Sequence, residues 1–196
     1  MYDFNVMLRF TALVLLLGAC SRPAPAALPV MATVPDFALT DQSGAAFDSN
    51  TLEGKVWVAN FVFTRCPIIC PTFTAKMASI QKGTEGLADV RLVSFTVDPE
   101  FDTAQKLGEY ATLHHAGPRW TFLTGTRPAL ETVIIKGMMQ AMVKGDGSLM
   151  SIGHGSHFVL VDRQQAIRGF YRFSDEGSVE AVLKDAAVLT AEKDRL

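Results

Sequence analysis

Apolar residues form two nearly continuous runs in the middle of the chain. Residues 55–63 and 91–97 have the length of strands and few polar positions, which is typical of strands buried on both faces of a sheet. Shorter alternating patterns surround them. They predict a hairpin with a Gly-containing turn at 36–47, a short strand at 120–123 and a second hairpin at 158–173.

The segments between these strands have apolar residues at intervals of three and four, which predicts helices. They are residues 71–81, 102–114 and 127–142, followed by a last helix in which Ser178 is the expected N-cap. Strand and helix thus alternate around a central parallel pair, closed by an antiparallel hairpin. The predicted fold is an α/β sandwich of thioredoxin type, with a central mixed β-sheet flanked by helices.

Composition supports one globular domain and excludes a nucleic-acid-binding surface of the usual kind. The chain has 196 residues, a net charge of −2 and 48% hydrophobic residues. A single domain of this size buries an adequate core. A near-neutral charge provides no basic patch for nucleic acid.

The N-terminal segment is predicted to be a secretory signal, residues 1–19. Arg9 precedes the apolar run 10–17, which is shorter than the ~20 residues of a spanning helix. The following Leu-Gly-Ala-Cys resembles the lipobox of bacterial lipoproteins, which implies cleavage before Cys20 and a lipid on its sulfur. A plain signal peptide and an uncleaved anchor are the alternatives. Residues 20–33, rich in Pro and Ala, predict a flexible tether, and residues 34–196 form the domain.

The expected domain has one pair of cysteines, Cys66 and Cys70. Outside the cytoplasm, thiols persist only where they are kept reduced or bind metal. A disulfide across so short a loop stabilises little through chain entropy, so redox cycling and metal binding both remain open. Pro71 fits the first turn of a helix. The helix is therefore expected to begin near Pro71, with both sulfurs close to its positive end, which lowers thiol pKa.

Histidines decide whether this pair can form a metal site. Structural zinc prefers four ligands, whereas two thiolates and one imidazole satisfy Cu(I). His154 and His157 directly precede the strand 158–162, in a loop expected to face the cysteines; as solvated loop residues they would have no such role. His114 and His115 end a helix, where a surface position is favoured.

Four segments of the chain resemble, in order, the Sco/SenC family of copper-binding, thioredoxin-like proteins. They are FVFTRCPIICPT (61–72), FTVDPEFDT (95–103), WTFLTG (120–125) and the stretch from the histidines to VLVD (159–162). The resemblance covers residues 34–173 and implies Cys66, Cys70 and His154 as copper ligands, because the family's histidine usually stands five residues before this last strand. His157 is an outside candidate. Where the family commonly has Asp, this chain has Ile68, which is expected to favour the thiolate forms.

The resemblance implies a membrane-tethered copper chaperone on the periplasmic side of a bacterial membrane, anchored by a lipid on Cys20. Its cargo would be Cu(I) or Cu(II), and its acceptor the CuA site of cytochrome c oxidase subunit II. Other periplasmic copper chaperones and a thiol reductant would be further partners. The alternative is a thiol–disulfide reductase with Cys66 and Cys70 as the catalytic redox-active pair. A peroxidase of the same broad fold is a third hypothesis, without a signature of its own.

Two further groups allow a functional and a structural interpretation. Asp98 and Glu100 follow the second buried strand, where they would orient His154 or position a partner; turn and helix-start chemistry is the favoured interpretation. Four methionines suggest either copper transit or packing, and packing is favoured. They are Met138, Met139, Met142 and Met150.

Overall fold

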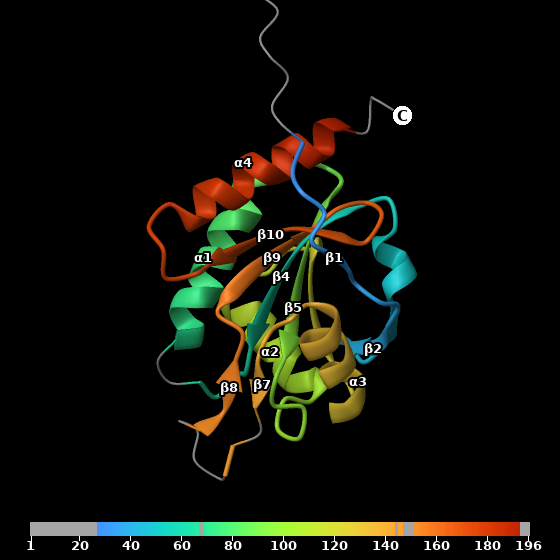
Figure 1. Ribbon diagram of the computed structural model, residues 1–196. Helices are drawn as coiled ribbons and strands as arrows, with labels where there is room; N and C mark the ends of the chain where they lie inside the picture. Colours follow the sequence, from blue (N-terminus) through green and yellow to red (C-terminus); the bar gives the residue numbers. More distant parts are fainter. Residues whose placement is uncertain (1–26, 67–68, 144, 147–150, 193–196) are drawn as a thin grey trace, which may run out of the picture.

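The computed structural model describes residues 27–66, 69–143, 145–146 and 151–192 (Figure 1). The strands are β1 (Ala32–Thr33), β2 (Ala38–Asp41), β3 (Ala46–Asp48), β4 (Val56–Val62), β5 (Val90–Thr96), β6 (Trp120–Thr124), β7 (Met142–Val143), β8 (Gly153–His154), β9 (His157–Val161) and β10 (Ala166–Arg172). The helices are α1 (Ile69–Gly83), α2 (Ala104–Leu113), α3 (Arg127–Glu131) and α4 (Ser178–Ala191), with the 3₁₀-helix η1 (Ser49–Leu52) and the π-helix η2 (Thr132–Gly137).

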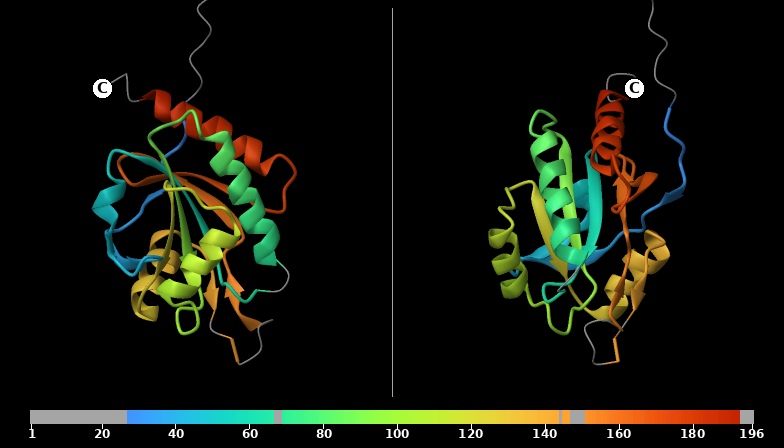
Figure 2. Two further views of the ribbon diagram at one scale, coloured as in Figure 1. Left: turned by 180° about the vertical axis from the view of Figure 1, so that it is seen from behind. Right: turned by 90° about the vertical axis from the view of Figure 1, so that its left-hand side faces the viewer.

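The main sheet is mixed and has the strand order β1-β10-β9-β4-β5-β6-β2-β3. Its centre is β4, every residue of which is buried. β4 runs parallel to β5 and antiparallel to β9, and helices flank the sheet (Figures 1 and 2). The buried strands and the mixed thioredoxin-like sheet confirm the predicted fold class.

Alternate residues of β4 supply two hydrophobic cores, one on each face of the sheet. Val56 and Val58 face a core shared with α1, α2 and α4. Trp57 and Phe61 face the other core, which is closed by α3 and η2. Because successive side chains of a strand point to opposite faces, one apolar run serves both cores and fixes the strand in the middle of the molecule.

Two predicted helix features are wrong in detail. The helix predicted over 127–142 ends at Gly137, as α3 followed by the π-turn η2. Met139 then adopts a left-handed φ of 55°, which stops helical continuation and turns the chain toward β7. At α4 the N-cap is Gly177, with φ 75°, rather than Ser178. Ser178 is the first helical residue, and its hydroxyl accepts a hydrogen bond from Lys76 Nζ at 3.2 Å.

The N-terminal segment lies against the domain from its first described residues. β1 pairs with β10, and the Arg168 guanidinium donates to the carbonyl oxygens of Leu28 and Pro29. This part differs from the flexible tether predicted over residues 20–33, because strand pairing and a buried guanidinium hold it.

The predicted signal segment and Cys20 lie outside the described residues. Within the described part of the chain, no helix is both long and apolar enough to cross a membrane.

Candidate metal centre

The topology brings the predicted ligands to one edge of the sheet. The chain leaves the carboxyl end of β4 into Thr64 and Cys66, and then enters α1. β9 is antiparallel to β4, so the residues just before β9, including His154, return to the same edge. This is where open α/β sheets usually bind ligands.

Cys66, Cys70 and His154 form a compact cluster. One ligand atom from each residue lies within 4.8 Å of the other two. Cys70 Sγ is 3.7 Å from His154 Nε2, and the Cys70 backbone N–H donates to Cys66 Sγ at 3.4 Å. Both cysteines are thiols rather than a disulfide. The structure therefore brings together the three residues that the sequence selected.

His157 does not belong to this cluster, which comprises the three residues above among the described part of the chain. It begins β9, and its ring meets Phe170 edge to face at 6.4 Å. His114 is also elsewhere: it caps the C-terminal end of α2 and its ring lies 4.3 Å from that of Tyr110. The preference for His154 over the other histidines thus has a geometric basis.

The helix after the cysteines begins two residues earlier than predicted, at Ile69. Cys70 consequently lies in the first turn of α1 rather than in a loop before it. Pro71 is compatible with this start, because a residue in the first turn needs no intrahelical N–H donor. Ile68, expected to affect the thiolates, lies outside the described residues.

The two thiols have different surroundings. Cys66 is half-buried, whereas Cys70 is 1% exposed. Burial raises the pKa of the Cys70 thiol well above its ordinary value, because the apolar environment disfavours a thiolate. The prediction that the helix terminus lowers the pKa of both thiols is therefore wrong for Cys70. A metal must displace the proton of Cys70 in order to bind there.

The hydrogen bond of His154 fixes its tautomer, and burial favours its neutral form. Its Nδ1 lies 2.8 Å from the carbonyl oxygen of Gly155; since a carbonyl only accepts, Nδ1 carries the proton and Nε2 keeps its lone pair toward Cys70. Burial lowers the pKa of His154 and outweighs the opposite effect of this hydrogen bond, so the neutral imidazole is favoured. The rings of Phe63 and Phe73 lie 5.8 and 6.3 Å from the imidazole and restrict its orientation.

This set of donors fits a soft ion of low coordination number. Two thiol sulfurs and one imidazole nitrogen suit Cu(I). They fall one ligand short of the four that close a structural zinc site, within the described residues. The chemistry of the donors therefore favours copper over zinc.

The acidic residues after β5 contact other partners than His154. Asp98 Oδ2 accepts a hydrogen bond from Arg65 Nε at 2.7 Å, and Glu100 pairs with Arg127. The proton on His154 Nδ1 points to the Gly155 carbonyl instead. These ion pairs differ from the helix-start role expected of the two acids, since the N-cap of α2 is Thr103. The interaction of Arg65 with Asp98 was not predicted.

The methionines divide between core and surface. Met138 and Met142 are 0% and 5% exposed, in the core that also contains Cys70, as the packing interpretation expects. Met139 is 54% exposed, and Met150 lies outside the described residues. Met142 also lies opposite His154 in the register of β7 and β8. The sequence predicted neither of these two strands.

Sequence reasoning missed Thr64 and Asp102. The Asp102 carboxylate accepts hydrogen bonds from the backbone N–H and the hydroxyl of Thr64, two residues before Cys66. Both residues lie in segments that resemble the Sco/SenC family, 61–72 and 95–103, but the sequence indicated no role for either. The available signal was their position after neighbouring parallel strands, whose carboxyl ends meet at one edge of the sheet.

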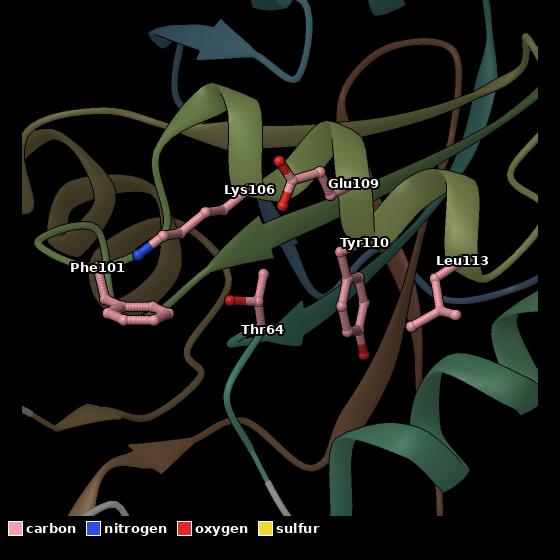
Figure 3. Close-up of a pocket in the computed structure, with 6 residues that line it drawn as sticks. All are labelled: Thr64, Phe101, Lys106, Glu109, Tyr110 and Leu113. Carbon is pink, nitrogen blue, oxygen red and sulfur yellow. The ribbon is translucent and has the colours of Figure 1, made fainter.

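A pocket of about 290 Å³ adjoins the Cys66 segment (Figure 3). It lies between Thr64 and one side of α2, and its walls are mostly apolar. The residues that line it are Thr64, Phe101, Lys106, Glu109, Tyr110 and Leu113. The pocket includes none of the three candidate ligands, so it is a neighbour of the metal centre rather than part of it.

Comparisons with known proteins agree with this arrangement. The SCO1/SenC family model matches residues 26–190. A SCO1 protein homolog of Bacillus subtilis is 32% identical over 160 residues, which cover 80% of this chain and 82% of the relative. A SCO1/SenC family lipoprotein from Bacillus anthracis superimposes with a TM-score of 0.74 at 31% identity, covering 80% and 94% of the two chains.

A third comparison concerns a structure with metal. ScoI of Arabidopsis thaliana, solved with copper bound, has a TM-score of 0.69 at 25% identity and is matched over 99% of its length and 80% of this chain. The match of the family model over most of the chain, together with this fold and these relatives, shows that the protein belongs to the SCO1/SenC family.

Proposed function

We propose that this protein is a membrane-tethered extracytoplasmic copper chaperone. The observation that carries the proposal is the cluster of Cys66, Cys70 and His154, whose ligand atoms lie within 4.8 Å of one another. Membership of a family that includes a copper-bound structure supports the assignment of the metal. Copper is the cargo here, and the protein holds it in a form that a partner can take over.

The chemistry of the site suits a transient hold on Cu(I) or Cu(II). Cys66 is the more exposed thiol and Cys70 the more buried one, so an acceptor meets Cys66 first. Stepwise exchange would replace one protein ligand at a time with a ligand of the acceptor. His154 needs no proton movement for this exchange, because its Nε2 already faces the sulfurs.

The proposed acceptor is the CuA site of cytochrome c oxidase subunit II. BsSco, which matches with a TM-score of 0.73 at 31% identity, is a member of the Sco family of cytochrome c oxidase assembly proteins, which supports this class of partner. We also propose a position on the periplasmic side of a bacterial membrane, anchored by a lipid on Cys20. The lipobox-like sequence and the lipoprotein relative from Bacillus anthracis support the anchor.

A second candidate function is reduction of a disulfide in the acceptor. It is favoured by the contrast between a half-buried Cys66 and a buried Cys70. The Cys66 thiolate would attack the acceptor disulfide, forming a mixed disulfide and releasing one acceptor thiol. Cys70, after losing its proton, would then attack Cys66 Sγ, so that the Cys66–Cys70 disulfide forms and the second acceptor thiol leaves. The acceptor gains the two electrons that the cysteine pair loses.

Anaerobic titration of the reduced protein with Cu(I) and Cu(II) separates these functions. The chaperone proposal expects tight binding that is sharply weakened in His154→Ala and retained in His157→Ala, the matched control. Disulfide reduction should largely survive His154→Ala, since the imidazole takes no part in thiol exchange. Absence of tight copper binding by the wild-type protein would overturn the chaperone proposal.

A further inference from the structure

We propose that Asp102 is a positioning residue that sets the place of Cys66 before copper arrives. The inference deepens the proposed copper site and rests on it. Asp102 follows β5, directly before Thr103, the N-cap of α2. It is fully buried, at 0% exposed. A carboxylate so far from water must have a full set of hydrogen bonds in order to be tolerated.

The hydrogen bonds of Asp102 converge from two strand ends. Thr64 gives it two donors: the backbone N–H lies 3.2 and 3.1 Å from Oδ1 and Oδ2, and the hydroxyl lies 2.6 Å from Oδ1. The hydroxyl of Thr96 donates to Oδ2 at 2.6 Å. That hydroxyl also accepts the N–H of Asp98, so it joins Asp102 to the end of β5. Both carboxylate oxygens therefore act as acceptors, a role that an amide nitrogen cannot take.

The backbone of Asp102 is itself held by two hydrogen bonds. Its backbone N–H donates to the carbonyl of Asp98 at 2.9 Å, and its own carbonyl accepts from the hydroxyl of Thr124 at 2.9 Å. The carboxylate is thus attached to the ends of β5 and β6, which are interior strands of the sheet. A rigid support of this kind is what a positioning group requires.

The segment that Asp102 holds is the one that carries Cys66. Only Thr64 and Arg65 separate Cys66 from the buried Phe63, whose carbonyl accepts the Cys66 N–H at 3.1 Å. Arg65 is also tied to the loop after β5, through Asp98. The arginine contact is the weaker anchor, because that side chain is 39% exposed and exposed ion pairs contribute little.

Space beside the segment makes the anchor necessary. Thr64 lines the pocket of about 290 Å³, opposite side chains of α2 (Figure 3). Packing alone therefore leaves room for the segment to shift, and the hydrogen bonds to Asp102 oppose that shift. If Cys66 moved away, its sulfur would no longer lie beside Cys70 and His154. Copper binding would then have to bring the three ligands together, and the free-energy cost of this ordering would weaken the affinity.

Two variants test this role. Asp102→Asn replaces one acceptor oxygen with a donor, and Thr64→Val removes the hydroxyl while keeping the backbone N–H. We expect each to weaken copper binding by about 10-fold or more and to alter the thiolate-to-Cu(II) charge-transfer spectrum. Thr64→Ser, which keeps the hydroxyl, should retain the wild-type affinity and spectrum. The measurements are competitive titration of the reduced protein against a chelator, absorption spectra and thermal unfolding.

Asp162→Asn is the matched control. Asp162 is another buried carboxylate, 5% exposed, at the far end of the sheet. Its substitution should lower the unfolding temperature but leave the copper affinity and the spectrum unchanged. If Asp102→Asn does not fold, Thr64→Val and Thr64→Ser decide the question.

The outcomes separate the two proposals. Failure of the wild-type protein to bind copper would overturn the proposed function. Tight wild-type binding with unchanged affinity and spectrum in both Asp102→Asn and Thr64→Val would overturn the positioning role alone. An equal loss of affinity in Asp162→Asn would also overturn it, because the effect would then reflect general destabilisation.

Discussion

Buried carboxylates anchor both ends of the sheet, but with different partners. At the metal-centre end, Asp102 accepts hydrogen bonds from neutral groups of Thr64 and Thr96. At the opposite end, Asp162 accepts two backbone N–H groups and pairs with the buried Arg168 at 2.7 Å. Burial raises the pKa of Asp102. The far end thus pairs its carboxylate directly with a buried cation, whereas the site end holds its carboxylate through hydrogen bonds from neutral groups.

The far end also receives the N-terminal segment. Arg168 contacts the carbonyl oxygens of Leu28 and Pro29, and the blue segment in Figure 1 leaves the domain away from β7 and β8. The metal centre lies at the end of the sheet opposite to the one that these N-terminal residues contact. One end of the sheet therefore receives the described N-terminal segment, and the other carries the candidate metal centre.

The largest expected effect is confined to the site end. Cys70→Ser should abolish tight copper binding, because a hydroxyl does not supply the soft thiolate that Cu(I) prefers. The fold should persist, since the change replaces one sulfur atom with an oxygen. Competitive chelator titration checks the affinity, and circular dichroism serves as the control for folding. Retained tight binding would show that Cys70 is not a ligand.

The reverse effect is expected at the far end. Arg168→Met leaves Asp162 as an unpaired buried charge, which should lower the free energy of unfolding by about 3 kcal/mol. Copper affinity should not change. Denaturant unfolding and copper titration of the same sample measure both quantities. A marked loss of copper affinity would show that the two ends of the sheet are energetically coupled.

A smaller effect is expected beside His154. A Cβ on Gly155 would lie 2.6 and 2.7 Å from atoms of Gln140 and 3.0 Å from the ring of Phe61. Gly155→Ala should therefore cost about 1–3 kcal/mol of stability and weaken copper binding, because the Gly155 carbonyl orients the imidazole. Gly86→Ala is the control, since nothing lies within 4 Å of a Cβ there. Equal behaviour of the two variants in unfolding and titration would contradict this expectation.

The smallest effect concerns pH. Burial lowers the pKa of His154 in the folded protein, while an unfolded histidine titrates near about 6.5. Below that pH the unfolded chain binds a proton that the folded chain does not, so the stability of the metal-free protein falls as pH decreases toward the folded pKa. His154→Gln should reduce this dependence. Chemical unfolding between pH 7 and pH 5 tests it, and an unchanged slope in the variant would contradict it.

Much of the fold followed from local patterns. The apolar runs predicted β4 and β5 within one residue at each end, because a strand buried on both faces has few polar positions. The end of the third predicted helix did not follow. Helical spacing continues to Met142 in the sequence, but Met139 turns left-handed and Met142 joins β7, where pairing with β8 outweighs local propensity.

The candidate site was predicted in its ligands but not in its environment. The spacing of Cys66 and Cys70, together with the resemblance that selected His154, gave the three residues that the structure brings together. The burial of Cys70, which raises its thiol pKa, reversed the expected effect of the helix terminus. Exposure depends on which elements cover a residue, and the sequence around Cys70 does not contain that information.

By itself, the sequence of this protein determined its buried strands and its pair of thiols, because these depend on residue type and spacing. It selected His154 through the resemblance to the Sco/SenC family. Only the tertiary structure decided that Asp102 holds the segment before Cys66 and that Met142 lies across from His154. Contacts of this kind join residues far apart in the chain. They exist because parallel neighbouring strands end at one edge of the sheet, and because an antiparallel strand returns to that same edge.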